Sequence, residues 1–125
     1  MNDLELGWLV GLFEGEGTCG VYGPYEYAPA RALMTVASTD LDVVQRVQDL
    51  TKRGHVTSME RKPSAVCAEP KTIHRWQLSA VADVAEVCEL LYPLLHSRRQ
   101  EQMKPVMEFC AERIKCRSSG RRRRT

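Results

Sequence analysis

The sequence predicts an α+β fold in which helices pack on one face of a four-stranded, mainly antiparallel, saddle-like sheet. Apolar residues recur at helical spacing in several segments, whereas β-branched and aromatic residues dominate others. The strand-like segments come in pairs close enough in sequence to form hairpins, with helices between the pairs. The resulting order is αββαββα with one further helix, which is neither a repeat solenoid nor a parallel βαβ fold.

The first half of this pattern covers residues 4–54. Residues 4–15 are predicted to be a helix, with Asn2 or Asp3 as N-cap and Gly17 as its end. Strands are expected at 18–27 and 31–38, separated by a loop with Pro29, followed by a helix that starts at the Thr39-Asp40 cap and ends before Gly54.

The second half repeats the hairpin and adds two helices. Strands are expected at 55–62 and 72–79, and the second of them alternates a polar face with a largely apolar face. A helix then opens at Asp83 or Ser79 and is bent or ended by Pro93, and a last helix covers about 98–115.

Length and composition limit the class of protein. With 125 residues, of which 43% are hydrophobic, we expect a single domain at 1–116 and a basic tail at 117–125. No apolar run approaches a membrane span of roughly 18 residues, and the first fifteen residues hold acids but no Lys or Arg, so neither a membrane protein nor a targeting peptide is expected. Five cysteines without a C-x-x-C pair favour reduced thiols and an intracellular location, cytoplasmic or organellar.

Charge is unevenly distributed along the chain. The net charge is +2, but the tail holds five Arg and no acid, which leaves residues 1–116 at −3. The tail is either a solvated arm or a phosphate-binding arm. Residues 52–75 hold six basic residues against two acids, so the second hairpin is basic where the helices are acidic.

The first helix carries Gly7, Gly11 and Gly15 along one stripe without side chains. Each glycine costs a helix roughly 1 kcal/mol relative to Ala, so a compensating close contact with another helix is expected. If that helix belongs to a second copy, the contact is a two-fold dimer interface that brings Glu14 and Glu16 of both copies together, where Mg²⁺ would relieve their repulsion. The alternative is incidental glycines and ordinary solvated acids.

The segment Leu9-Val10-Gly11-Leu12-Phe13-Glu14-Gly15-Glu16-Gly17 resembles the nine-residue motif of the LAGLIDADG homing endonucleases. The likeness includes the first glycine, two alternate acids and the closing glycine, and the order of elements over about 4–115 is the one it implies. A single motif copy in a chain of this length is similar to the homodimeric members. The resemblance therefore implies a homodimeric, Mg²⁺-dependent endonuclease that makes a double-strand break in a long, pseudo-palindromic DNA target.

The resemblance also implies roles for individual residues. Glu16 matches the acid that binds the catalytic cation, with the Gly15 carbonyl completing the metal shell, while Glu14 matches a more structural acid. Glu replaces the commoner Asp at both positions. Arg98 is assigned to transition-state charge or water positioning, and Ser38 to the water network, with helix capping as the alternative for Ser38.

The exposed strand faces are the expected DNA-reading surface, because a two-stranded ribbon fits the major groove and alternate side chains reach base edges. Arg31, Arg75 and Gln77 are the leading candidates as base readers. The full set of expected DNA-binding residues is Thr18, Tyr22, Arg31, Leu33, Thr35, His55, Thr57, Arg61, Arg75 and Gln77.

Two other functions remain open. One is a noncatalytic nucleic-acid-binding module of the same fold, an intron maturase or a regulator, for which RNA is a possible partner. The other is a small homodimeric structural or regulatory protein whose basic tail docks on an acidic partner.

Overall fold

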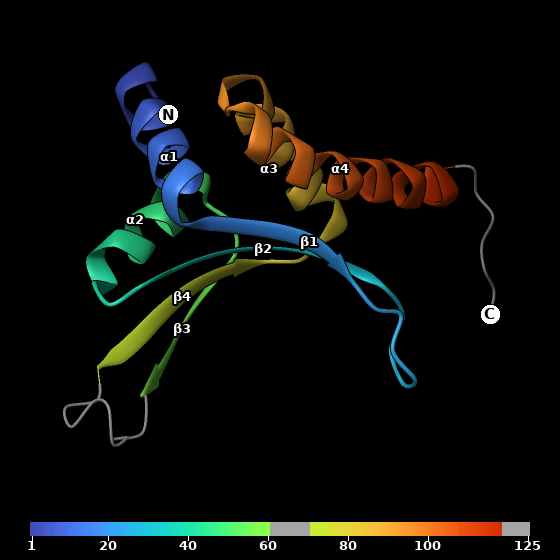
Figure 1. Cartoon of the computed structure of the whole chain (residues 1–125), viewed down its shortest axis with the longest axis horizontal. Coiled ribbons are helices and arrows are strands. Elements are labelled where there is room, and N and C mark those ends of the chain that lie inside the picture. Colours follow the sequence, from blue (N-terminus) through green and yellow to red (C-terminus); the bar gives the residue numbers. More distant parts are fainter. Residues whose placement is uncertain (61–70, 119–125) are drawn as a thin grey trace. The chain divides into compact units, whose positions relative to one another are not determined.

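A computed structural model describes residues 1–60 and 71–118. Within these ranges the elements are α1 (Asp3–Glu16), β1 (Gly17–Tyr22), β2 (Arg31–Ser38), α2 (Leu41–Thr51), β3 (His55–Glu60), β4 (Thr72–Leu78), α3 (Val81–Leu91), the 3-10 helix η1 (Tyr92–Leu94) and α4 (Ser97–Ser118). The strands form an antiparallel open sheet in the order β1-β2-β4-β3 (Figure 1). The predicted α+β class and element order are confirmed.

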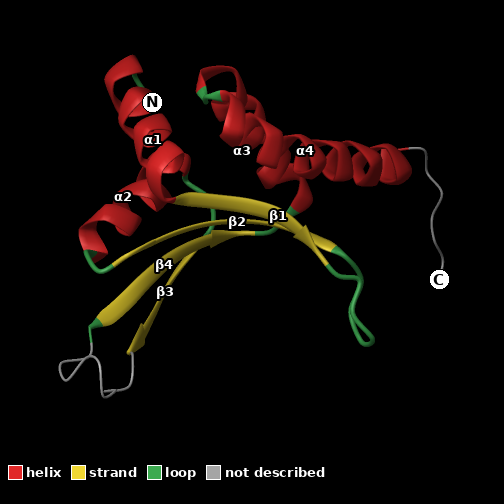
Figure 2. Ribbon diagram, viewed as in Figure 1, coloured by secondary structure: helices red, strands yellow, loops and turns green. Residues whose placement is uncertain are grey.

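The chain divides into two compact units. Unit 1 comprises Met1–Gly17 and Thr35–Gln77, and unit 2 comprises Thr18–Met34 and Leu78–Thr125. Within each unit the helices lie on one face of the strands (Figure 2). The part of the chain that is described holds no helix long and apolar enough to cross a membrane.

Unit 1 has a core centred on the indole of Trp76. Leu9 and Phe13 of α1, and Val44 and Val47 of α2, are buried in the same unit. The indole Nε1–H of Trp76 donates a hydrogen bond of 2.8 Å to the carbonyl of Arg53, so the polar atom of this large buried side chain is paired. The guanidinium of Arg46 lies 4.3 Å from the centre of the Trp8 ring, which links α2 to α1.

A tight turn joins α2 to β3 directly beneath that tryptophan. Lys52 ends α2 in the left-handed region with φ 57°, and Gly54 follows with φ 90°. A β-carbon at Gly54 would overlap the indole of Trp76. The glycine that the sequence marks as a helix end is therefore required for both its backbone conformation and the close approach of Trp76.

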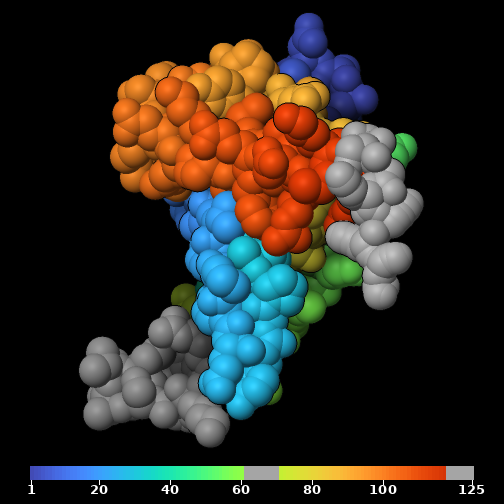
Figure 3. Space-filling view, turned by 90° about the vertical axis from the view of Figure 1, so that its right-hand side faces the viewer, coloured from blue at the N-terminus to red at the C-terminus, as the bar shows by residue number. Residues whose placement is uncertain are grey.

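Unit 2 is built on the contact between α3 and α4, whose ribbons lie together in Figure 2. Val84, Cys88 and Leu91 of α3 and Met103 and Val106 of α4 are all buried. The space-filling view shows the β1–β2 hairpin projecting away from α4 (Figure 3).

Some predicted boundaries differ from the observed elements. β1 ends at Tyr22 rather than at Tyr27, because Gly23 has φ 88° and Pro24 cannot donate to a sheet ladder. α4 begins at Ser97 and continues to Ser118 with Pro105 inside it. The strand expected at 55–62 is described to Glu60, and its last two residues lie outside the described ranges.

Candidate functional site

Helix α1 begins with strong local stabilisation. The side chain of Asn2 accepts a hydrogen bond of 2.8 Å from the N–H of Glu5, and the Glu5 carboxylate accepts one of 2.9 Å from the N–H of Asn2. This reciprocal capping box satisfies donors that the helix itself leaves without partners. Of the two N-caps that the sequence allows, the structure uses Asn2.

The other end of α1 carries acids where the helix dipole disfavours them. Glu14 and Glu16 lie in the last turn, which contains no basic residue. A carboxylate at the negative end of a helix costs about 0.3–1 kcal/mol, so an added positive charge would stabilise this end. Glu16 is exposed, so its carboxylate is accessible to a ligand.

Gly17 ends the helix for a steric reason. Its N–H donates to the carbonyl of Phe13, and a β-carbon at position 17 would overlap the ring of Phe13, which is 2% exposed. The closing glycine therefore lets the chain turn into β1 directly over a buried aromatic ring, and this turn holds Glu16 at the surface.

The glycine stripe lies on an open face of α1. Gly7, Gly11 and Gly15 are exposed, and a β-carbon built on any of them would meet nothing within 4 Å. The described part of this chain thus supplies no packing partner that requires these glycines. Among the described residues of the unit, no close contact offsets their cost to the helix.

Oxygen donors suited to a hard cation are present at this end of α1, but one chain offers few of them. The Glu16 carboxylate and the carbonyl oxygens of the last turn, Gly15 included, are of the type that Mg²⁺ prefers. Among the described residues, no group of three or more His, Cys, Asp or Glu side chains is arranged to hold a metal ion. The donors fit a cation that keeps several waters and takes one carboxylate from this chain.

Ser38 has a local partner. Its hydroxyl oxygen accepts a hydrogen bond of 3.0 Å from the N–H of Asp40, at the turn into α2. The side chain of Asp40 occupies the N-cap position without capping. This bond stabilises the turn before α2 and caps none of the helix N–H groups, so both roles considered for Ser38, helix capping and the water network, stay predictions.

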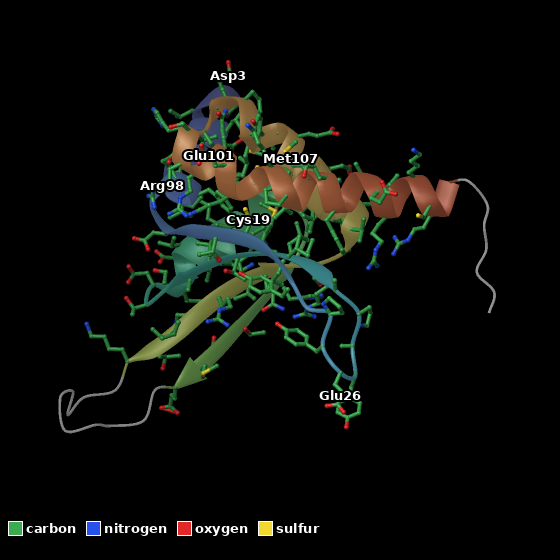
Figure 4. All side chains as sticks on the ribbon, turned by 45° about the vertical axis from the view of Figure 1, so that its right-hand side comes forward. Asp3, Cys19, Glu26, Arg98, Glu101 and Met107 are labelled. Carbon is green, nitrogen blue, oxygen red and sulfur yellow. The ribbon has the colours of Figure 1, made fainter. Side chains whose placement is uncertain are left out.

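Arg98 belongs to unit 2, on the first turn of α4, and is exposed. Figure 4 shows it at the opposite end of the unit from Glu26, at the tip of the β1–β2 hairpin. The neighbouring Arg99 donates to the side chain of Gln102 at 2.9 Å and its charge acts on Cys19. Arg98 lies in the other unit from Glu16.

The β3–β4 ribbon separates a core face from an open face. His55 pairs with Gln77, Thr57 with Arg75 and Met59 with Ile73, so these six side chains share one face. The intervening pairs, including Val56 with Trp76, share the face that carries the buried indole. The structure therefore brings His55, Thr57, Arg75 and Gln77 together as expected, whereas Arg61 lies outside the described ranges.

Strand β2 alternates in the same way, and β1 exposes residues near its two ends. Along β2, Ala32, Met34 and Val36 are buried, whereas the predicted residues between them are exposed or half-buried: Arg31, Leu33 and Thr35. In β1, Thr18 and Tyr22 are exposed. The Tyr22 ring lies across Gly20, because a β-carbon there would be 3.0 Å from the Tyr22 hydroxyl.

Two apolar residues of the open face are missing from the sequence-based set. Met59 is 64% exposed, and together with Ile73, Thr57 and Arg75 it lines a hollow of ≈ 180 Å³. The same alternation that selects positions 55 and 57 selects 59, and that which selects 75 and 77 selects 73. Selecting mainly polar residues left them out.

The buried thiols of unit 2 are not reactive groups. Burial, together with the nearby Cys19, Cys110 and Glu89, raises the pKa of Cys88 to about 12. Burial raises the pKa of Cys19 to about 11, partly opposed by the charge of Arg99. These thiols stay protonated at neutral pH, which excludes them as nucleophiles there.

Neither a protein-family model nor a curated protein matches this chain significantly. Solved structures do. The homing endonuclease I-CvuI, in complex with its target, is 19% identical, with a TM-score of 0.64, over 87% of this chain and 67% of that one. The archaeal intron-encoded homing endonuclease I-Vdi141I, complexed with DNA, is 12% identical, with a TM-score of 0.70, over 90% of this chain and 70% of that one.

A third structure shows the same likeness in a longer protein. The LAGLIDADG homing endonuclease I-GzeII, in complex with a DNA target, is 7% identical, with a TM-score of 0.69, over 92% of this chain but 37% of that one. The protein has the fold of the LAGLIDADG homing endonucleases, and the resemblance drawn from its motif is confirmed at the level of the fold.

Proposed function

We propose that this protein is a divalent-cation-dependent DNA endonuclease that works as a homodimer on a long, pseudo-palindromic site. The observation that carries the proposal is the end of α1, where an exposed Glu16 follows an open glycine stripe. DNA-bound homing endonucleases of the same fold support a nuclease acting on DNA.

The dimer follows from the cost of the glycines. Three glycines in one helix cost roughly 3 kcal/mol relative to alanines, and the described part of the chain makes no use of their small size. A second copy of α1 crossing along the stripe would offset this cost through close backbone packing. The same crossing would bring the two Glu16 side chains near a common two-fold axis, so that each Glu16 acts on one DNA strand.

In this proposal the chain's own groups divide the work. The Glu16 carboxylate and the Gly15 carbonyl would hold a divalent cation, which would supply positive charge to the scissile phosphate and lower the pKa of bound water. The Arg98 guanidinium adds charge that favours the more negative transition state. The open strand faces fix which phosphate reaches the site, through His55, Thr57, Arg75 and Gln77 on the β3–β4 ribbon and Arg31, Leu33 and Thr35 on β2.

Cleavage of a randomised DNA duplex library with Mg²⁺ tests this function, with sequencing of the ends produced. Wild type should give paired breaks at a recurring long, near-symmetric site, and Glu16→Gln should abolish them while the protein still binds the same duplexes. The matched control is Glu112→Gln, which removes the charge of an exposed acid on α4. Recovery of particular duplexes without cleavage would instead support the noncatalytic binding module, and the same selection with RNA would test a maturase.

Removing residues 117–125 separates the role of the basic tail. If the protein is the proposed nuclease, the deletion should lower its affinity for DNA and weaken the dependence of binding on salt concentration, because five arginines are lost. The choice of cleavage site should not change. A changed site with an unchanged salt dependence would contradict a phosphate-binding arm.

A further inference from the structure

The hollow on the open face of the β3–β4 ribbon has the chemistry of a specific base-reading pocket. It is formed by two successive cross-strand pairs, Thr57 with Arg75 and Met59 with Ile73. Among the described residues, Met59 and Ile73 present apolar side chains to it, Thr57 a methyl and a hydroxyl group, and Arg75 a guanidinium. Its ≈ 180 Å³ exceeds several-fold the ~30 Å³ that one water molecule occupies, so it can take a methyl group and the edge of the ring that bears it.

Each wall matches a different feature of a base pair in the major groove. The C5 methyl group of thymine is the apolar feature presented there, and side-chain methyl groups are its usual contacts. Arginine donates a bidentate pair of hydrogen bonds to O6 and N7 of guanine. Arg75 is exposed on the open face of the ribbon, where its guanidinium can reach such a base edge.

Resting on the proposed function, we propose that Met59, Ile73 and Thr57 form a receptor for the C5 methyl group of a pyrimidine, and that Arg75 reads a guanine directly beside it. The methyl group belongs to thymine or to a methylated cytosine. This assigns specificity to two residues, Met59 and Ile73, that carry no hydrogen-bonding side chain. Met59, unbranched and 64% exposed, can close over the methyl group without disturbing the core.

Binding selections with randomised duplexes in three chemical forms test this inference. The first library contains thymine, the second uracil in its place, and the third uracil together with 5-methylcytosine. Selections run in EDTA, so that bound duplexes stay intact. Wild type should enrich a thymine beside a guanine, and replacement of that thymine by uracil in a selected duplex should weaken binding about fourfold, the effect of one buried methyl group. Enrichment of 5-methylcytosine in the third library would show that the receptor accepts the methyl group of either base. Enrichment of thymine in the first library without enrichment of 5-methylcytosine in the third would assign the methyl group to thymine.

Variants then separate the two halves of the hollow. Met59→Ala should bind the thymine and uracil forms of a selected duplex equally, whereas Arg75→Ala should lose roughly 5- to 150-fold of guanine preference and keep the thymine preference. Ser58→Ala is the matched control, because Ser58 lies one residue away on the opposite face, where it bonds His74 at 2.7 Å. Its discrimination should equal that of wild type.

The results that would overturn the inference differ from those that would overturn the function. Equal binding of the thymine and uracil forms by wild type, or unchanged discrimination in Met59→Ala, would contradict the methyl receptor. Cleavage of the selected duplexes with Mg²⁺ would still support the proposed endonuclease in that case. Failure to recover any recurring duplex removes both.

Discussion

The indole of Trp76 and the backbone of Arg53 are joined by a hydrogen bond of 2.8 Å that spans from the middle of β4 to the turn before β3. Trp76 is 1% exposed, and Arg53 is flanked by two residues with positive φ, Lys52 and Gly54. One side chain thus contributes to both the core of unit 1 and the conformation of the turn that starts the β3–β4 ribbon.

Trp76→Phe should therefore destabilise the fold. Phenylalanine lacks the pyrrole ring of the indole and its N–H, so the carbonyl of Arg53 loses this donor and keeps the Thr51 hydroxyl. Loss of one hydrogen bond costs about 0.5–1.5 kcal/mol of unfolding free energy, and the volume vacated in the core adds to this cost. Urea denaturation followed by circular dichroism measures the change. Tyr27→Phe, at a residue 92% exposed, is the control and should match wild type. A wild-type midpoint for Trp76→Phe would mean that the hydrogen bond contributes nothing.

Two glycine substitutions in the motif should act in opposite directions on the isolated chain. Gly11→Ala meets no neighbour within 4 Å, so it should stabilise the monomer by about 1 kcal/mol while weakening or abolishing the proposed dimer. Gly17→Ala should destabilise the monomer, because its β-carbon overlaps the buried ring of Phe13. Unfolding curves at low protein concentration and sedimentation over a concentration series separate these effects. A Gly11→Ala protein that dimerises like wild type would rule out the glycine stripe as the interface.

Arg98→Ala should slow cleavage more than it weakens binding. Loss of one oxyanion-hole donor, which also acts on developing negative charge, costs roughly 10²–10³ in rate, and we expect a loss of similar size here. Single-turnover cleavage and equilibrium binding of one selected duplex provide the two readouts. Lys104→Ala removes an exposed charge from the same helix and should leave the rate unchanged. Equal losses for both variants would indicate a general charge effect, not a role near the phosphate.

Folding stability should decline in alkali because of Cys88. Its pKa rises from 9.0 to about 12 on burial, so the unfolded chain releases the proton first as pH increases. The contribution is fully present below pH 9 and is lost between pH 9 and about 12. Urea midpoints at a series of pH values should therefore fall more steeply for wild type than for Cys88→Ala. Parallel pH profiles would contradict the raised pKa.

Sequence patterns predicted the faces of the strands better than their ends. Because a strand has a period of two, alternation predicted that Arg75 and Gln77 lie on the face opposite to that of Trp76. The register of the ribbon and the burial of Trp76 confirm this prediction. The predicted end of β1 was wrong. The aromatic residues after Tyr22 favour a strand, but Gly23 and Pro24 interrupt its hydrogen-bond ladder. Local propensity does not reveal which of two such signals prevails.

The site was less accessible to sequence reasoning than the fold. Glu16 and the three glycines follow from one contiguous motif, so their common helix could be predicted. The hollow beside Arg75 depends on the pairing of Met59 with Ile73, which comes from the register of two strands separated by the segment 61–70. Arg98 lies far from the motif in sequence and belongs to the other unit, so its relation to Glu16 is not contained in any local pattern.

The division of the β3–β4 ribbon into a core face and an open face also bears on how such a protein changes over generations. Positions 55, 57, 75 and 77 can be replaced without touching the indole that holds the ribbon in place, because they point away from it. Most substitutions there should leave folding intact. If the protein acts on DNA as proposed, such a chain could change from one target sequence to another through folded intermediates, and the ribbon would be the place to redirect it to chosen targets.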